Sequence, residues 1–337
     1  MSRVIRLSLL CALLIALIAG CIAPTAQAPA GGGEAAAVQF PSKAIQIMAP
    51  ANPGGGWDTT ARLVAQKLTE GKISSVPVEV FNVPGAGGTV GLAQLASQNQ
   101  GDAHTIMMMG RVMIGAILTN NSPVTLKETT PLARLTAEYE AIVVNAASPY
   151  QTLQDLVDAF KADPKSIAWA GGSAGGTDHI LVGQIAKVVG VAPADINYIA
   201  YAGGGEASTA ILANEVAAGV SSVSEFSEFV RAGQMRMLAV SSEKRLDVVA
   251  DVPTLKESGV DVALLNWRGL VAPAGISDAE RAALVDLLTK MNESQAWKDE
   301  LAAQGWDNVF LTDGFDAYLE EENATITAVL KEIGLVK

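Results

Sequence analysis

Three glycine-rich segments carry the residue types best suited to ligand chemistry in this 337-residue chain. They are 52–58 (NPGGGWD), 82–89 (NVPGAGGT) and 171–178 (GGSAGGTD), and each lies between an expected strand and an expected helix. In an open α/β sheet this position is the carboxyl edge, where ligands bind. Glycine lets backbone N–H groups approach a ligand closely, and the N-terminus of the following helix adds a partial positive charge. These features predict an anion site that needs no lysine or arginine.

Several polar residues near these segments also have a purely structural interpretation. Asp58 and Thr177 could cap the helices that follow them, and Ser173 could be an ordinary loop hydroxyl. Arg111 follows a strongly apolar run at 105–109. We expect Arg111 either to stand at the same sheet edge as a counter-charge for a polycarboxylate, or to form a salt bridge in solvent.

Two catalytic motifs can be tested on the sequence itself. Residues 171–175 match G-x-S-x-G, the nucleophile elbow of hydrolases, in which an acid and then a histidine follow the serine along the chain. The only histidine after Ser173 is His179, inside the helix that the loop opens, where we expect it to pack or pair locally. The glycines of 85–91 miss the dinucleotide-binding spacing by one position. We therefore predict a protein that is not an enzyme and that uses no cofactor.

The elements that would hold these loops repeat one pattern, a short apolar strand followed by a loop and an amphipathic helix. This alternation predicts an α/β fold with parallel strands and crossover helices. Capping-box signals at Thr152 with Asp155 and at Ser277 with Glu280 predict helix starts, and the last helix should cover 315–333. The expected strands are 44–48, 78–83, 105–109, 142–145, 167–170, 197–200, 216–220 and 237–240.

Composition and charge exclude other classes of function. The chain has 23 Lys plus Arg against 35 Asp plus Glu, a formal net charge of −12, and therefore lacks the basic surface that nucleic-acid binding requires. It has only two cysteines and two histidines, which argues against a metal site. Half of its residues are hydrophobic, enough to bury a core.

The first residues are predicted to be an export signal. Arg3 and Arg6 precede an apolar run at 7–19 that is too short to span a bilayer, as in a secretory signal peptide over residues 1–20. Residues 17–21 (LIAGC) resemble the lipobox of bacterial lipoproteins, which predicts lipidation of Cys21 and a membrane anchor; ordinary cleavage near Ala26 or Ala28 is the alternative. Residues 21–37 are expected to form a flexible tether.

The glycine loops and several other motifs together resemble one known family. In order along the chain the motifs are 53–58 (PGGGWD), 61–62 (AR), 83–88 (VPGAGG), 172–179 (GSAGGTDH), 201–206 (YAGGGE), 252–259 (VPTLKESG) and 266–269 (NWRG). With this order and spacing, residues of about 40–335 resemble the substrate-binding component of tripartite tricarboxylate transporters, the TctC or Bug family.

This resemblance implies a type II periplasmic-binding-protein fold with two lobes, each a sheet flanked by helices, and a ligand in the cleft between them. Lobe 1 would comprise 38–144 plus 266–337 and lobe 2 would comprise 145–265, with crossing segments near Val144 and Trp267. The ligand-binding residues implied by the resemblance, together with Arg111 from the argument above, are Gly55, Gly56, Asp58, Gly85, Ala86, Gly87, Gly88, Thr89, Arg111, Ser173, Gly175, Gly176, Thr177, Asp178, Gly203, Gly204, Ser221 and Ser222.

The function implied is that of an exported solute-binding protein. It would capture a small di- or tricarboxylate outside the cell membrane or in the periplasm and deliver it to the membrane subunits of the transporter. Two alternatives stay open at this point. The same fold could present its loaded form to a signalling receptor, or the chain could be an exported serine hydrolase.

Overall fold

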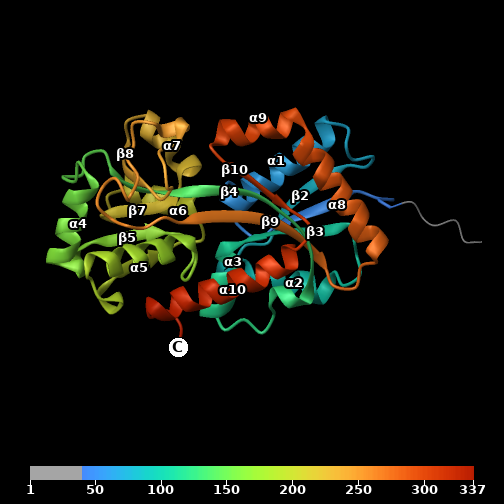
Figure 1. Ribbon diagram of the computed structural model, residues 1–337, viewed down its shortest axis with the longest axis horizontal. Coiled ribbons are helices and arrows are strands. Elements are labelled where there is room, and N and C mark those ends of the chain that lie inside the picture. Colours follow the sequence, from blue (N-terminus) through green and yellow to red (C-terminus); the bar gives the residue numbers. More distant parts are fainter. Residues whose placement is uncertain (1–39) are drawn as a thin grey trace, which may run out of the picture. The chain divides into compact units, whose positions relative to one another are not determined.

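Ten strands and ten α-helices follow one another along residues 40–337, the part of the chain that the computed structural model describes (Figure 1). The predicted signal peptide, the tether and Cys21 lie outside these residues. The strands are β1 (Ile45–Ala49), β2 (Val78–Asn82), β3 (Thr105–Gly110), β4 (Thr129–Asn145), β5 (Ala168–Gly171), β6 (Asn197–Ala200), β7 (Ala218–Ser222), β8 (Met235–Val240), β9 (Leu265–Pro273) and β10 (Asp307–Leu311). The helices are α1 (Gly56–Glu70), α2 (Thr89–Gln98), α3 (Arg111–Thr119), α4 (Leu153–Ala162), α5 (Thr177–Val189), α6 (Gly204–Leu212), α7 (Val223–Arg231), α8 (Asp278–Glu293), α9 (Gln295–Gln304) and α10 (Phe315–Glu332).

The strands form one sheet in the order β2-β1-β3-β9-β4-β7-β5-β6, with β8 and β10 also paired to β4. Two half-sheets can be distinguished by the way β4 pairs. Residues 129–139 of β4 pair with β9, in what we call the first half-sheet (β1, β2, β3, β9 and β10). From Glu140 onward β4 pairs with β7 and β8 in the second half-sheet (β5, β6, β7 and β8). The long strand β4 is therefore common to both.

Helices cover both half-sheets. In Figure 1, α4, α5, α6 and α7 lie beside the second half-sheet, whereas α2, α3, α8 and α10 lie beside the first, and β4 and β9 run between them. The main hydrophobic core includes Trp169 and Trp267, whose side chains are fully buried. Every residue of β3 is buried, which agrees with the strongly apolar run at 105–109. Among residues 40–337, no helix is long and apolar enough to span a membrane.

The predicted helix starts are confirmed. Thr152 and Ser277 each form the expected capping box, with Asp155 and Glu280, and the last helix covers Phe315–Glu332.

The strand prediction needs two corrections. The expected strand 142–145 is only the end of the 17-residue β4, and β9 and β10 were not predicted at all. Polar residues such as Thr136, Glu138 and Glu140 interrupt the apolar pattern of β4, although all three are buried. The sheet is also mixed, because β4 and β9 run antiparallel to their neighbours while β1, β2 and β3 pair in parallel. Nothing in the local apolar pattern distinguishes these two directions.

Ser277→Ala tests the contribution of the capping box at the start of α8. The Ser277 hydroxyl oxygen accepts the Glu280 N–H, and the Glu280 carboxylate accepts hydrogen bonds from the Ser277 N–H and hydroxyl. Loss of such a cap costs about 1 kcal/mol, so the free energy of unfolding in urea should fall by about that amount. The exposed Ser97→Ala on α2 serves as the control; an equal loss in both variants would contradict a capping role.

Candidate functional site

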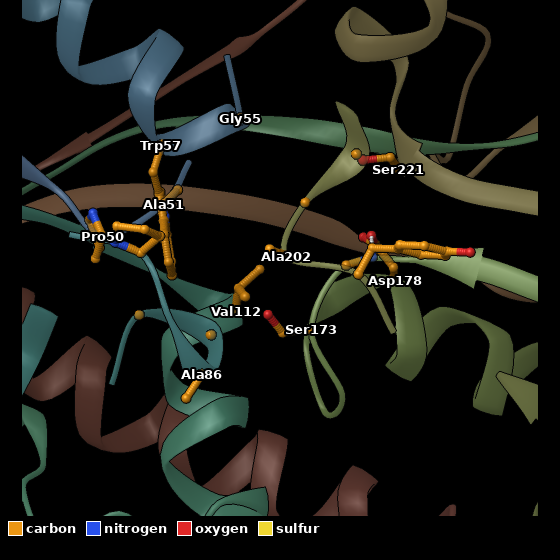
Figure 2. A pocket seen from close by; sticks show the side chains of 18 of the residues that line it. Pro50, Ala51, Gly55, Trp57, Ala86, Val112, Ser173, Asp178, Ala202 and Ser221 are labelled. Atoms are coloured by element: carbon orange, nitrogen blue, oxygen red, sulfur yellow. Dashed lines mark hydrogen bonds between the residues drawn. The ribbon is translucent and has the colours of Figure 1, made fainter. Parts of the chain in front are cut away.

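A cavity of about 340 Å³ lies between loops of the two half-sheets. Its volume is in the range of small-molecule sites. Figure 2 shows Pro50, Ala51 and Trp57 along one side of it and Ser221 and Asp178 along the other, with Ser173 and Val112 between them. The cavity therefore receives side chains and backbone from segments that are far apart in the sequence.

The loop between β1 and α1 supplies one wall through Gly55 and Gly56. Gly55 is the N-cap of α1 and makes no side-chain cap, so free N–H groups of the first helical turn remain at this wall. A Cβ atom on Gly56 would lie 2.1 Å from a terminal nitrogen of Arg268. Glycine at this position is therefore what allows the guanidinium to lie against the start of the helix.

The loop between β2 and α2 supplies the floor through residues 85–88. Gly87 and Gly88 have φ angles of 62° and 90°, the left-handed region that favours glycine. The Ala86 carbonyl accepts hydrogen bonds from Thr89 Oγ1 at 2.9 Å and Asn120 Nδ2 at 3.0 Å. A Cβ atom on Gly87 would meet Ala116 at 2.4 Å and the Ser173 side chain at 3.3 Å. This loop is thus fixed in place against the loop that precedes α5.

The loop between β5 and α5 carries Ser173 and is held by buried polar contacts. Gly172 N–H donates to Asp178 Oδ2 at 2.6 Å, and Tyr198 Oη donates to the Gly172 carbonyl at 2.7 Å. Gly175 N–H donates to His179 Nδ1 at 3.2 Å, and the His179 ring stacks on Tyr198 at 4.0 Å. His179 thus pairs locally, as predicted. With Nδ1 engaged by its own loop, the structure gives no support to a Ser173–His179 catalytic pair.

The remaining wall comes from the second half-sheet, through residues 201–204, Ser221 and Glu225. Glu225 lies in the first turn of α7 and accepts hydrogen bonds from the hydroxyls of Ser221 and Ser222. A Cβ atom on Gly204 would meet both Glu225 Oε2 and Ser221 Oγ within 2.4 Å. The N-terminus of α6 therefore packs directly against this carboxylate.

Arg268 of β9 is the one basic residue that lines the cavity in the described part of the chain. It is 5% exposed, pairs with the buried Glu138 of β4 and donates to Thr60 Oγ1 of α1 at 3.1 Å. Its guanidinium also lies 5.5 Å from the centre of the Trp306 ring. These contacts use two of the five N–H groups of a guanidinium, so donors remain for a ligand.

At and behind the cavity wall, buried carboxyls outnumber this single cation. Burial raises the pKa of Glu138 despite its pairing with Arg268, and it raises the pKa of Glu140 well above the ordinary value, with repulsion from Asp178 as the next cause. Burial also raises the pKa of Asp178 to about 7. Both carboxyl oxygens of Glu140 lack a hydrogen-bond donor among the described residues. The structure thus favours the protonated form of Glu140, because an ionised form would be buried without a partner.

Eleven of the predicted site residues line the cavity, which brings together the three glycine-rich segments, the motif at 201–206 and Ser221. These are Gly55, Gly56, Gly85, Ala86, Gly87, Gly88, Ser173, Asp178, Gly203, Gly204 and Ser221. Six others do not line the cavity. Asp58, Thr89, Gly175, Thr177 and Ser222 are each next in the chain to a lining residue, and Gly176 is two positions from Asp178. Whether any of these residues touches a ligand stays a prediction.

The capping roles expected for Asp58 and Thr177 are wrong. Both residues lie inside the first turn, with Gly55 and Gly176 at the N-cap positions. Asp58 instead accepts from Gly54 N–H at 2.9 Å and pairs with Arg62. The Thr177 hydroxyl donates to Asn266 Oδ1 of β9 at 3.2 Å.

Arg111 does not line the cavity. Its Nη1 pairs with Glu322 Oε2 of α10 at 3.1 Å, and the Trp267 indole N–H donates to the same oxygen at 2.7 Å. The pair is largely buried, with side-chain exposures of 11% and 12%, so it is neither a counter-charge at the cavity nor a solvent salt bridge. The following residue, Val112, takes the lining position.

Sequence reasoning missed several lining residues, above all Arg268, Glu225 and Asn266. Arg268 and Asn266 belong to a motif that was quoted for the resemblance but given no ligand role. Arg268 thus places a basic side chain at the cavity, which the argument from the glycine loops did not predict. The sequence did offer a signal, because Arg268 lies within an otherwise mostly apolar run. A charged residue in such a run is expected to be buried, and a charged residue is rarely buried without a partner or a function.

Comparison with known proteins agrees with the motifs. Residues 60–335 match the family model described as "Tripartite tricarboxylate transporter family receptor". The chain belongs to this family. A curated relative of this receptor is the protein BugT of Bordetella pertussis, 28% identical over 301 residues that cover 88% of this chain and 90% of BugT.

Solved structures show the same fold. MatC from Rhodopseudomonas palustris with bound malate is 22% identical, with a TM-score of 0.76 over 86% of this chain and 100% of MatC. Another R. palustris protein, with adipate, is 20% identical, with a TM-score of 0.80 over 88% of this chain and 98% of that protein. This receptor thus has the predicted α/β periplasmic-binding-protein fold, and its family is one of exported binding proteins.

Arg268→Met tests the buried ion pair. It should lower the free energy of unfolding in urea by about 3 kcal/mol, because Glu138 is left as an uncompensated buried charge. Adding Glu138→Gln should recover part of the loss. Arg231→Met, which removes an exposed pair with Glu228, should cost no more than about 0.5 kcal/mol. If the losses of unfolding free energy in the single variants at 138 and 268 simply add up in the double variant, the two side chains are not coupled and this expectation is contradicted.

Asp178→Asn tests the raised pKa of this carboxyl. Between about pH 4 and pH 7 the unfolded state releases the Asp178 proton before the folded state does, so ionisation favours unfolding as pH rises. The variant lacks this penalty, and its melting temperature relative to wild type should therefore rise across this window and level off above it. The exposed Asp158→Asn is the control. A difference that does not change with pH would contradict the assignment.

Proposed function

We propose that this receptor captures a small organic carboxylate in the cavity and delivers it to the membrane subunits of a tripartite tricarboxylate transporter. The observation that carries the proposal is the cavity of about 340 Å³, lined by glycine backbone at the starts of helices together with one guanidinium. Backbone N–H groups and a helix N-terminus bind an anion without added charge, and a guanidinium can hold a carboxylate through two parallel hydrogen bonds.

The solved structures of the same fold support this class of ligand. MatC is described with malate and the second R. palustris protein with adipate, and both compounds are dicarboxylates. Membership of the TctC family supports a role in solute uptake and not in catalysis. We propose further that the ligand carries two or three carboxylate groups.

The two half-sheets with their helices would act as the two lobes of a hinged receptor. Contacts across the cavity support a closed arrangement: Asn52 Nδ2 donates to Glu206 Oε1 at 2.8 Å, and Thr119 Oγ1 donates to the Ala174 carbonyl at 3.2 Å. A ligand shifts such an equilibrium only if it binds the closed form better. Because the cavity is lined from both sides, a bound carboxylate would supply that difference, and the permease would recognise the closed surface.

The membrane association of the receptor is a further part of the proposal. The lipobox-like sequence at 17–21 supports acylation of Cys21, which would tether the receptor near its permease. Residues 22–37, rich in Ala, Gly and Pro, would then act as the linker between the lipid and the folded part.

Calorimetric titration with citrate, tricarballylate, succinate, glutamate and terephthalate tests the ligand class, with neutral sugars as the comparison. At least one carboxylate should bind. Gly87→Val should weaken that binding by about tenfold or more, because the added side chain would displace the loop from its place against Ser173.

Gly259→Val is the matched control, since Gly259 also has a positive φ (85°) and has open space around its Cβ position. It should retain full affinity. Binding of sugars alone would refute the proposal, and unchanged affinity of Gly87→Val would remove this loop from the site.

A further inference from the structure

Four carboxyl side chains lie close together at one wall of the cavity. Glu138 and Glu140 belong to β4, Asp178 to the first turn of α5 and Glu225 to the first turn of α7. Asp178 and Glu225 line the cavity, whereas Glu138 and Glu140 are almost fully buried. Arg268 is paired with Glu138, and no other salt bridge among residues 40–337 includes a member of this group. The wall therefore holds more acidic groups than positive charge.

Asp178 is a member of this group that a ligand in the cavity can meet. Figure 2 shows it along the cavity wall, and it is 8% exposed. Its Oδ2 accepts the Gly172 N–H at 2.6 Å, and its Oδ1 has no donor among the described residues. Burial raises the pKa of Asp178 to about 7 and repulsion from Glu225 and Glu138 adds to this effect, although the Gly172 N–H favours the ionised form. Asp178 can therefore change its charge near neutral pH.

Glu140 lies next to Asp178 and has no other source of compensation. It is fully buried, and neither of its carboxyl oxygens is offered a donor by the described residues. A hydrogen bond between the Glu140 and Asp178 carboxyls is among the contacts that favour the ionised form of Asp178. Two carboxyl groups can form such a bond only when one of them carries a proton. Glu140 thus holds one proton, and Asp178 is the neighbour that can gain or lose a second one.

The other groups around Asp178 bring no positive charge at neutral pH. Burial raises the pKa of Tyr198, whose hydroxyl donates to the Gly172 carbonyl at 2.7 Å. The His179 ring stacks on Tyr198, and burial lowers the pKa of His179 to about 4, so this ring stays neutral. Within the described residues, no group of three or more His, Cys, Asp or Glu side chains could hold a metal ion. A proton is therefore the cation that this wall can accept most readily.

A carboxylate in the cavity adds negative charge beside Asp178. Like charges repel strongly where water is largely excluded, so the ligand favours the protonated form of this side chain. We propose that the receptor takes up a proton when it binds its carboxylate ligand, and that Asp178 holds this proton. A protonated Asp178 also offers the ligand an O–H donor in place of a repelling charge. This inference rests on the proposed carboxylate-binding function and adds a proton to it.

Proton uptake makes binding depend on pH in one direction. The free protein loses the Asp178 proton at about pH 7, whereas the complex keeps it to higher pH. Between about pH 7 and pH 8.5 the affinity should therefore fall about tenfold, and below about pH 6 it should change little. A receptor of this kind loads best in mildly acidic surroundings.

Calorimetry in buffers of different ionisation enthalpy counts the protons in the wild-type protein. The probe is the most tightly bound of succinate, tricarballylate, citrate, terephthalate and glutamate, titrated at about pH 8 in HEPES and in Tris. The carboxyl groups of all five are ionised at this pH, so the difference in heat reports protons that the protein takes up. We expect more than about half a proton per ligand bound. No uptake, or release of protons, would overturn the inference.

Asp178→Asn then identifies the group that takes up the proton. Asparagine keeps an acceptor for the Gly172 N–H, but the uptake should fall to near zero and the affinity should no longer change with pH. Glu140→Gln should keep the uptake, because glutamine has the uncharged state that Glu140 already has. The exposed Asp158→Asn on α4 is the control and should behave as wild type. Undiminished uptake in Asp178→Asn, or its loss in Glu140→Gln, would overturn the assignment to Asp178.

The two proposals fail in different ways. Binding of a carboxylate without proton uptake contradicts the role of Asp178 but preserves the carboxylate-binding function. If no carboxylate of the panel binds at any pH between about 6 and 8.5, the proposed function itself is wrong, and this inference is wrong with it.

Discussion

The buried ion pair between Arg268 and Glu138 joins the cavity to the framework of the protein. Arg268 belongs to β9, Glu138 to β4, and Thr60, which accepts a further hydrogen bond, to α1. Burial of two charges is tolerated only when they pair and are otherwise hydrogen-bonded. The pair therefore constrains the alignment of β4 with β9 and the position of the α1 N-terminus at the same time. Residue 56 is a glycine for the same reason, because any side chain there would overlap the guanidinium of Arg268.

Local chemistry explains why much of the site could be predicted from the sequence. Glycines at 54–56, 85–88 and 171–176 are needed where the backbone turns sharply from a strand into a helix, and such turns gather at the carboxyl edge of parallel strands. Ten of the eleven predicted lining residues follow from this rule and from the family motifs, and Ser221 follows from the family resemblance alone. The capping boxes at Thr152 and Ser277 could also be predicted from the sequence, because each depends on residues only three positions apart.

The features that were missed depend on pairing between distant segments. Glu138 and Arg268 are separated by 130 positions, and no local pattern states that β4 and β9 will be antiparallel neighbours. Arg111 illustrates the same limit, because its partner Glu322 is 211 positions away. From the sequence Arg111 was equally consistent with a ligand or with solvent, and the partner that decided the matter was a buried carboxylate on the last helix.

Strand β4 changes partners between Tyr139 and Glu140, and this has a mechanical consequence for the charges beside it. Alternate residues of a strand share a face, so Glu138 and Glu140 project from the same side of the backbone on either side of that point. Flexing the strand there would swing one acidic group relative to the other. A bend in β4 at this point would therefore change both the shape of the cavity and the electrostatic environment of these two buried carboxyl groups.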